Sequence, residues 1–243
     1  MRKEVYQVPS EVLAKNLQVN VYGHFGINFL LFPITDDDPT EWEHVGLIKA
    51  LTPLIEKGHI KLFSVETNNL DSWLNNSIPH KERSDNHYKF NAALINDIVQ
   101  FIYNDNGSAV PIVTAGGGIG AFHAVNTYFR RPDIFIGTIG ANGFYDIRWL
   151  SGSFYDGNCY FNSPLHYLPN LTEDYWLSFL RSQNNVFLLA EEGNWDMINQ
   201  CNRLGDILNN KNIKHSIDVV NRQDFPDENI NKVMIEKIIK FKF

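Results

Sequence analysis

Apolar residues recur along the chain with two different spacings. Short apolar runs of strand length alternate with longer segments in which apolar residues recur every three or four positions, as on one face of a helix. The expected strands are 18–22, 29–32, 61–65, 110–114, 135–139, 186–190 and 216–220. The expected helices are 45–57, 87–103, 120–129, 196–209 and 229–241. Strands that alternate with long helices pair in parallel through right-handed crossovers. The pattern therefore predicts an α/β fold with an open, mostly parallel sheet covered by helices on both faces.

The segment from about 145 to 182 breaks this alternation. It is rich in Tyr, Trp, Asn and Pro. We expect it to be an excursion over the carboxyl edge of the sheet, where open α/β sheets bind ligands. A length of 243 residues suits one large α/β domain and is short for two. We therefore expect residues 1–243 to form a single domain.

Charge and hydropathy exclude several classes of partner. The net charge of -7 provides no basic surface for nucleic acid. No apolar run reaches the roughly 18 residues that a membrane helix needs. The basic start of the chain, Met1 to Pro9, has no apolar stretch behind it that would form a secretory signal. We expect a cytoplasmic protein in which Cys159 and Cys201 are free thiols, with no nucleic-acid or membrane partner.

A glycine-rich segment, Thr114 to His123, lies between a predicted strand and a predicted helix. Its context fits the nucleophile elbow of serine hydrolases, G-x-S-x-G, a sharp turn that holds a serine above the sheet. Residues Gly116 to Gly120 supply the flanking glycines, but Gly118 stands at the serine position.

The same segment also matches the dinucleotide fingerprint G-x-G-x-x-[GA] through Gly116, Gly118 and Ala121. This motif belongs in the first strand–helix unit, whereas the segment lies in the middle of the chain. The next strand, 135–139, also lacks the acidic residue at its end that would bind a ribose. These two points favour the elbow.

The chain resembles the esterase D and feruloyl-esterase-like family of α/β-hydrolases. Residues 114–126, TAGGGIGAFHAVN, are similar to the family's elbow, which runs close to TGASFGAYHAVN. Further segments resemble the family's RHPDVF, GIYDI, YYDDNVYFNNP and YLPNL, namely 131–135, 143–147, 154–164 and 167–171. Residues 22–26 and 72–75 also fit. The resemblance covers nearly the whole chain and implies the α/β-hydrolase fold.

The resemblance implies three catalytic side chains, and this chain departs from the family at each position. Gly118 stands at the serine. Asn194 stands at the acid, in a line like G-x-G-D-[YW]-E, although Asp196 could be a displaced acid. Gln223 stands at the histidine, in a line like HDWP, and no histidine follows His215. Glycine cannot attack a carbonyl, glutamine cannot act as a base near neutral pH, and asparagine cannot stabilise an imidazolium.

We therefore expect a degenerate triad with no active catalytic residue. The leading hypothesis is a catalytically inactive esterase-like protein, a pseudoenzyme that binds a small molecule above Gly118 or a protein partner, with a homodimer left open. One alternative is an enzyme that uses this scaffold without a serine nucleophile, as a lyase or isomerase would. Another is a carboxylic-ester hydrolase whose triad lies elsewhere in the chain.

An acidic run follows the second expected strand, where the family has a short Pro-Thr-Ser turn. It comprises Asp36, Asp37, Asp38, Glu41, Glu43 and His44. Oxygen ligands could bind a divalent metal, or the loop could be solvated and cap the next helix. The spacing matches no loop of alternating ligands, so we expect no metal and no cofactor. Carboxylates of Asp36 to Asp38 beside an oxyanion hole would oppose the charge that such a hole stabilises.

Eight residues are candidates for the wall of a pocket above Gly118. They are Ile119, His24, Asn75, His87, His123, Trp149, Tyr155 and Trp176. The histidines and the asparagine match family positions, and the three aromatic residues belong to the excursion over the site. Each also has a structural interpretation, with His123 a hydrogen-bonded core histidine and the aromatic residues packing elements.

Overall fold

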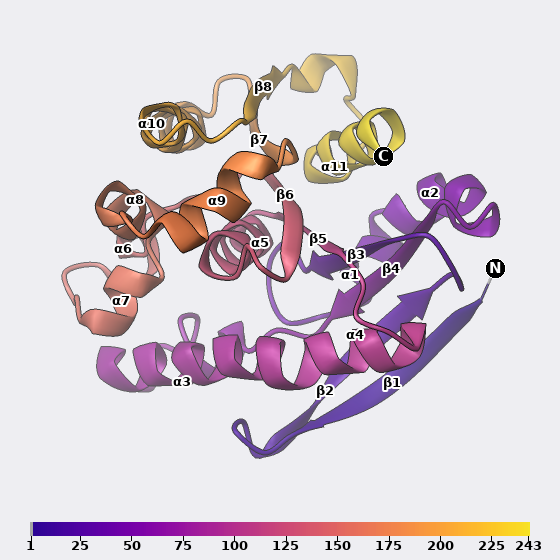
Figure 1. The fold of residues 1–243 in the computed structure, drawn as a ribbon, viewed down its shortest axis with the longest axis horizontal. Helices are drawn as coiled ribbons and strands as arrows, with labels where there is room; N and C mark the ends of the chain where they lie inside the picture. The colour runs from indigo at the N-terminus through magenta and orange to yellow at the C-terminus, as the bar shows by residue number, and fades with distance from the viewer. Residues whose placement is uncertain (1) are drawn as a thin grey trace.

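A computed structural model describes residues 2–243, and its strands form a single sheet (Figure 1). The strand order is β1-β2-β4-β3-β5-β6-β7-β8. The strands are β1 (Lys3–Ser10), β2 (Lys15–Tyr22), β3 (Ile27–Phe32), β4 (Ile60–Val65), β5 (Ile112–Gly117), β6 (Phe135–Ala141), β7 (Val186–Glu191) and β8 (Ser216–Val220). The pairs β1–β2 and β2–β4 are antiparallel, and β3 to β8 are parallel. The predicted fold class is confirmed.

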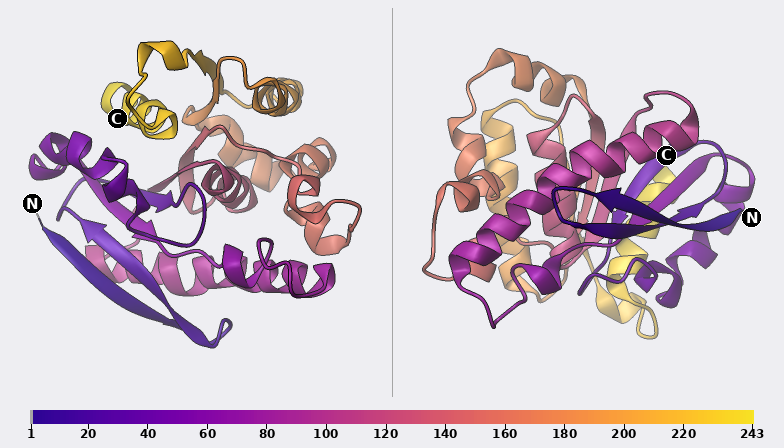
Figure 2. Two further views of the ribbon diagram at one scale, coloured as in Figure 1. Left: turned by 180° about the vertical axis from the view of Figure 1, so that it is seen from behind. Right: turned by 90° about the horizontal axis from the view of Figure 1, so that it is seen from below.

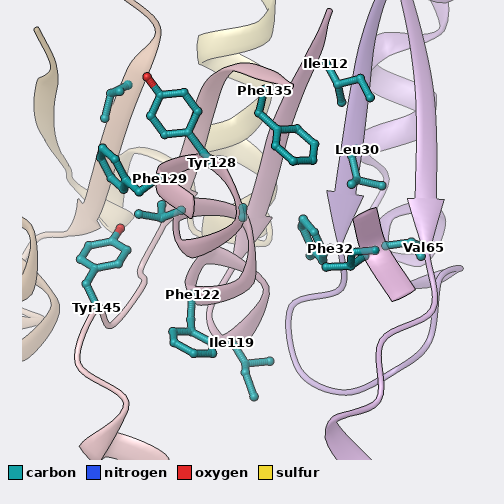
Figure 3. Packing of buried hydrophobic residues seen from close by; sticks show 14 of the residues in the cluster. Leu30, Phe32, Val65, Ile112, Ile119, Phe122, Tyr128, Phe129, Phe135 and Tyr145 are labelled. Carbon is teal, nitrogen blue, oxygen red and sulfur yellow. The ribbon is translucent and has the colours of Figure 1, made fainter. Parts of the chain in front are cut away.

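Helices cover both faces of this sheet. They are α1 (Glu41–His44), α2 (Leu47–Glu56), α3 (His80–Ala93), α4 (Val99–Asn106), α5 (Ile119–Arg130), α10 (Trp195–Asn210) and α11 (Ile230–Lys242). The apolar residues of α3, α4, α5 and α10 share one cluster with Leu30 and Phe32 of β3. Those of α2 and α11 share the other with Phe29 and Leu31. Successive strand residues point to opposite faces, so β3 contributes to both layers. Figure 3 shows residues of the first cluster, among them Phe32 of β3 and Phe122 of α5.

Two elements depart from the expected pattern. The strand β1 was not predicted, because only Val8 and Ser10 of its eight residues are buried and an edge strand of this kind carries no apolar run. The helix expected at 87–103 begins at His80 and continues to Asn106 through the short π-helical segment η2 (Leu94–Ile98). It runs beside the β1–β2 hairpin (Figure 2).

The segment between β6 and β7 forms four short α-helices and a 3-10 turn. They are α6 (Arg148–Ser151), α7 (Gly157–Phe161), α8 (Pro164–Tyr167), η3 (Leu168–Asn170) and α9 (Asp174–Ser182). Buried residues of this segment, such as Leu168 and Leu180, pack in the cluster that contains α5 and α10. The segment starts at the carboxyl edge after β6 and must return to the amino edge, because β7 begins there. None of the helices in residues 2–243 has both the length and the apolar character needed to span a bilayer.

Candidate functional site

The strand–turn–helix predicted around Gly118 is present. β5 ends at Gly117, α5 begins at Ile119, and Gly118 between them has φ +55° and ψ -122°. Residues with a side chain rarely adopt such angles, and they cost about 1–3 kcal/mol when imposed. The turn is tight, because a Cβ on Gly116 would overlap the backbone of Gly120.

The main-chain amide that would serve an oxyanion is already hydrogen-bonded. In a nucleophile elbow, the N–H of the residue after the nucleophile is one of the oxyanion donors. Here the N–H of Ile119 donates to the carbonyl oxygen of Ile34 at 3.2 Å. The same oxygen lies 2.6 Å from the place where a Cβ on Gly118 would stand. The loop after β3 therefore closes over the elbow.

Glu41 holds this loop in place. Its carboxylate accepts hydrogen bonds from the N–H of Ile34 at 2.5 Å, the N–H of Thr35 at 3.2 Å and the hydroxyl of Thr35 at 2.9 Å. The second oxyanion donor of α/β-hydrolases comes from this loop. In this chain, the loop amides at 34 and 35 point at a carboxylate, so both sources of oxyanion donors are satisfied internally.

The aspartates of the acidic run point elsewhere. The carboxylate of Asp37 accepts from the N–H groups of Asn69 and Leu70, and that of Asp38 accepts from the N–H of Thr40. Glu41, rather than Asp36 to Asp38, is therefore the acid that contacts the oxyanion loop. Within residues 2–243 no group of three or more His, Cys, Asp or Glu side chains is arranged to hold a metal ion.

The other two positions expected to correspond to the triad, Asn194 and Gln223, lie on loops at the same sheet edge. Asn194 is the N-cap of α10, and its Oδ1 accepts from the N–H of Met197 at 3.4 Å. Gln223 is exposed in the turn after β8. A hollow of about 740 Å³ joins Gln223 to Glu192 and Gly193, directly before Asn194. The structure brings these two loops together, and no hydrogen bond links either side chain to Gly118 within the described part of the chain.

His123 of α5 and His87 of α3 are buried side by side. The Nε2 of His123 lies 2.8 Å from Oδ1 of Asn69, and the Nδ1 of His87 accepts from the indole N–H of Trp73 at 2.8 Å. Their ring centroids are 5.4 Å apart. Burial lowers the pKa of His123 to about 3 and that of His87 well below its usual value. Both imidazoles are neutral near pH 7, and His123 is hydrogen-bonded within the core.

Two of the other pocket candidates lie away from the elbow. His24 is exposed in the turn between β2 and β3, at the amino edge of the parallel strands, whereas Gly118 is at the carboxyl edge. The Oδ1 of Asn75 accepts from the N–H and hydroxyl of Ser77, and Asn75 lines a surface hollow that also contains Lys15. We therefore leave His24 and Asn75 out of the site.

The aromatic candidates are spread over the excursion. Trp149 is exposed, with its ring 6.2 Å from that of Phe144. The hydroxyl of Tyr155 lies 2.6 Å from Nδ1 of His166. Trp176 lines a hollow with Arg130, at the opposite end of α5 from Gly118. Ile119 contacts the closing loop through its N–H, which donates to Ile34.

Comparison with known proteins identifies the fold. No family model matches the sequence, and no curated protein matches it significantly. Among solved structures, a ferulic acid esterase superposes with a TM-score of 0.69 at 13% identity, over 98% of this chain and 94% of that one. An S-formylglutathione hydrolase from Agrobacterium tumefaciens superposes with a TM-score of 0.70 at 9% identity, over 98% of this chain and 93% of that one. MPT51 from Mycobacterium tuberculosis superposes with a TM-score of 0.63 at 14% identity, over 98% of this chain and 96% of that one. The chain therefore has the α/β-hydrolase fold found in esterases.

Proposed function

We propose that this chain is a catalytically inactive, esterase-like α/β-hydrolase, a pseudoenzyme that acts as a binding module for a small molecule or a protein. The observation that carries the proposal is the hydrogen bond from the N–H of Ile119 to the carbonyl oxygen of Ile34. The carbonyl oxygen of Ile34 lies where an esterase would hold its serine side chain, and it takes up the N–H group that would otherwise bind the substrate oxyanion.

Each requirement of acyl transfer fails in a separate way. Gly118 supplies no nucleophile, and Gln223 supplies no base. Asn194 caps a helix in place of orienting an imidazole. Loss of one oxyanion donor alone costs on the order of 10²–10³ in rate, and here the loop also blocks access. The losses act on different steps, so no single replacement would restore hydrolysis.

A hydroxyl, an imidazole and a carboxylate are aligned outside the elbow, and they are the alternative candidate for a catalytic group in this protein. Tyr155 contacts Nδ1 of His166, whose Nε2 lies 3.3 Å from Oδ2 of Asp146. However, the Nη2 of Arg148 lies closer to the same Nε2, at 3.0 Å, and can only donate. Nε2 must then accept, which leaves the proton on Nδ1, so the imidazole donates to Tyr155 and cannot take its proton.

Hydrolysis of short-chain p-nitrophenyl esters and labelling by a serine-directed fluorophosphonate test the proposal. We expect no turnover above that of an unrelated protein at equal concentration, and no labelled serine. Stoichiometric labelling would refute it. Turnover that disappears in Tyr155→Phe would also refute it, and would assign the activity to the chain of Tyr155, His166 and Asp146.

A further inference from the structure

An aromatic hollow lies at the end of α5 farthest from Gly118. It has a volume of about 420 Å³, in the range of small-molecule sites. Phe129 from α5, Tyr160 from α7, Tyr167 from α8 and Trp176 from α9 provide aromatic surface. Arg130, the last residue of α5, is the cation that lines it.

Arg130 also lines a second hollow of about 250 Å³, on the side of α5 that faces α3. That hollow is also lined by Tyr88 and Asn91 of α3, by Thr127 of α5 and by Arg131. Arg130 therefore lines two neighbouring hollows, and the larger of them is the aromatic one.

The guanidinium of Arg130 has almost no partner of its own. Its Nη1 donates to Oδ1 of Asn162 at 3.3 Å, an oxygen that already accepts from Asn91 at 2.9 Å and from Asn126 at 2.7 Å. Across residues 2–243, no carboxylate forms an ion pair with Arg130.

The next residue, Arg131, makes a two-pronged pair with Asp133, at 2.8 and 2.7 Å. A guanidinium has five N–H donors, and most of those on Arg130 are unused.

This arrangement is costly for an empty site. Arg130 is half-buried, and burial lowers the pKa of its guanidinium. A cation taken from water is stabilised by a counter-ion or by hydrogen bonds to its remaining protons. Its place at the carboxyl end of a helix helps modestly but uses none of those donors. The missing partner is an anion.

We propose that this hollow binds a small organic anion, in which one carboxylate is attached to an aromatic or similarly flat apolar group. The carboxylate matches the planar fork of Arg130. The flat group matches the faces of Tyr160, Tyr167 and Trp176. Glu173 also lines the hollow, and its negative charge disfavours a ligand with a second anionic group. The site selects a monoanion.

This site is separate from the closed elbow. Twelve residues of helix at 1.5 Å each place Arg130 about 18 Å from Gly118. The proposal therefore goes beyond the inactive elbow and does not depend on it. A ligand could bind at Arg130 whether or not the protein hydrolyses esters, and the aryl-ester assay does not test it.

Titration calorimetry with 3-phenylpropionate, supported by tryptophan fluorescence, tests the site. The neutral 3-phenylpropan-1-ol is the matched probe without charge, and inorganic phosphate is the anion without a ring. We expect the carboxylate to bind at least about tenfold more tightly than either, since a charge-assisted bidentate pair accounts for that difference. Arg130→Gln should lose at least about tenfold in affinity, whereas Arg131→Gln should retain it. Glu173→Gln should bind more tightly.

Several results would overturn the proposal. They are equal affinity for the acid and the alcohol, equal affinity for phosphate, unchanged binding in Arg130→Gln, and no binding at millimolar concentration. If circular dichroism shows that Arg130→Gln does not fold, binding to Trp176→Ala decides the test. It leaves the cation intact, so weaker binding of the ring probe supports the site and unchanged binding overturns it.

Discussion

The carbonyl oxygen of Ile34 lies on the elbow of this α/β-hydrolase fold and accepts the N–H of Ile119 at 3.2 Å. It is also 2.6 Å from the Cβ position of residue 118. Real Cβ atoms do not approach an oxygen so closely. The glycine and the closed loop therefore depend on each other, since the loop can lie there only while residue 118 has no side chain.

Gly118→Ala should lower stability for two reasons, and the chain contains a control that separates them. Gly152 has nearly the same backbone angles, φ +58° and ψ -121°, but open space around it. Gly152→Ala should cost about 1–3 kcal/mol from backbone strain alone. Gly118→Ala should cost more, since it also displaces Ile34. Urea unfolding measures both, and an equal or smaller loss at 118 would contradict the contact with Ile34.

Glu41→Ala should release the loop over the elbow. The substitution leaves the N–H groups of Ile34 and Thr35 without their acceptor. Hydrogen bonds to a charged group contribute roughly 1.5–3 kcal/mol each. We expect lower stability and faster amide hydrogen exchange at residues 34, 35 and 119. Glu41→Gln keeps one acceptor oxygen and should lose less.

The control for this prediction is Glu11→Gln, at an exposed position in the β1–β2 turn. Its exchange at residues 34, 35 and 119 should match that of the natural chain. If Glu41→Ala leaves those amides as protected as before, the carboxylate does not hold the loop.

Sequence reasoning located the elbow because its signal is local. Glycines at 116, 118 and 120 follow an apolar strand and precede a helical pattern, and this spacing specifies a tight turn. The closure by Ile34 carries no such signal. It is made by main-chain atoms, which every residue has, so residue types cannot reveal it. The role of Glu41 was hidden for a related reason, since six acidic or histidine residues lie between 36 and 44 and the sequence does not show which side chain turns towards the elbow.

The segment from about 145 to 182 shows a second limit of prediction from the sequence. Its aromatic residues were expected above Gly118, but Trp176 lies at the other end of α5. A chain that leaves β6 at the carboxyl edge must reach the amino edge before β7 can run parallel to β6. α9 makes that return, so its side chains line the distant hollow. The sequence does not distinguish Arg130, which has no carboxylate partner within residues 2–243, from Arg131, which pairs with Asp133.

Stability should fall in acid, partly through His123. Its pKa is about 3 in the folded protein, below the usual value near 6.5 for an unfolded chain. The unfolded chain therefore takes up the proton first. The stability that depends on neutral His123 is fully present above about pH 6.5. As the pH falls towards 3, the free energy of unfolding decreases by about 1.4 kcal/mol per pH unit through this group.

His123→Gln keeps a donor for Asn69 and removes this titration, so its stability should depend less steeply on pH between 6 and 4. The exposed His24→Gln is the control and should retain the natural slope. Urea unfolding at a series of pH values measures the difference. A slope in His123→Gln equal to that of the natural chain would show that His123 does not stay neutral in the folded state.

Rebuilding the triad should require more than a serine. Gly118→Ser alone should remain inactive, because Gln223 cannot take the proton of a hydroxyl. Adding Gln223→His supplies a base, and adding Asn194→Asp supplies a group to orient it. Removal of a single triad member from a serine hydrolase costs on the order of 10⁴-fold, and the members act as a unit. Activity should therefore first appear when serine and histidine are both present, and should rise with the aspartate.

The triple variant should still be slow, since the N–H of Ile119 donates to Ile34 and Glu41 holds the loop. Adding Glu41→Gln should then increase turnover of a p-nitrophenyl ester, while the same change in the natural chain should produce none. This coupling between residue 41 and the rebuilt triad separates a closed oxyanion site from a triad that is merely misaligned. Substantial turnover by Gly118→Ser alone would show that a working base survives. His123 is bound to Asn69 and His24 lies at the opposite edge, so such a result would contradict both the closed elbow and the assignment of Gln223.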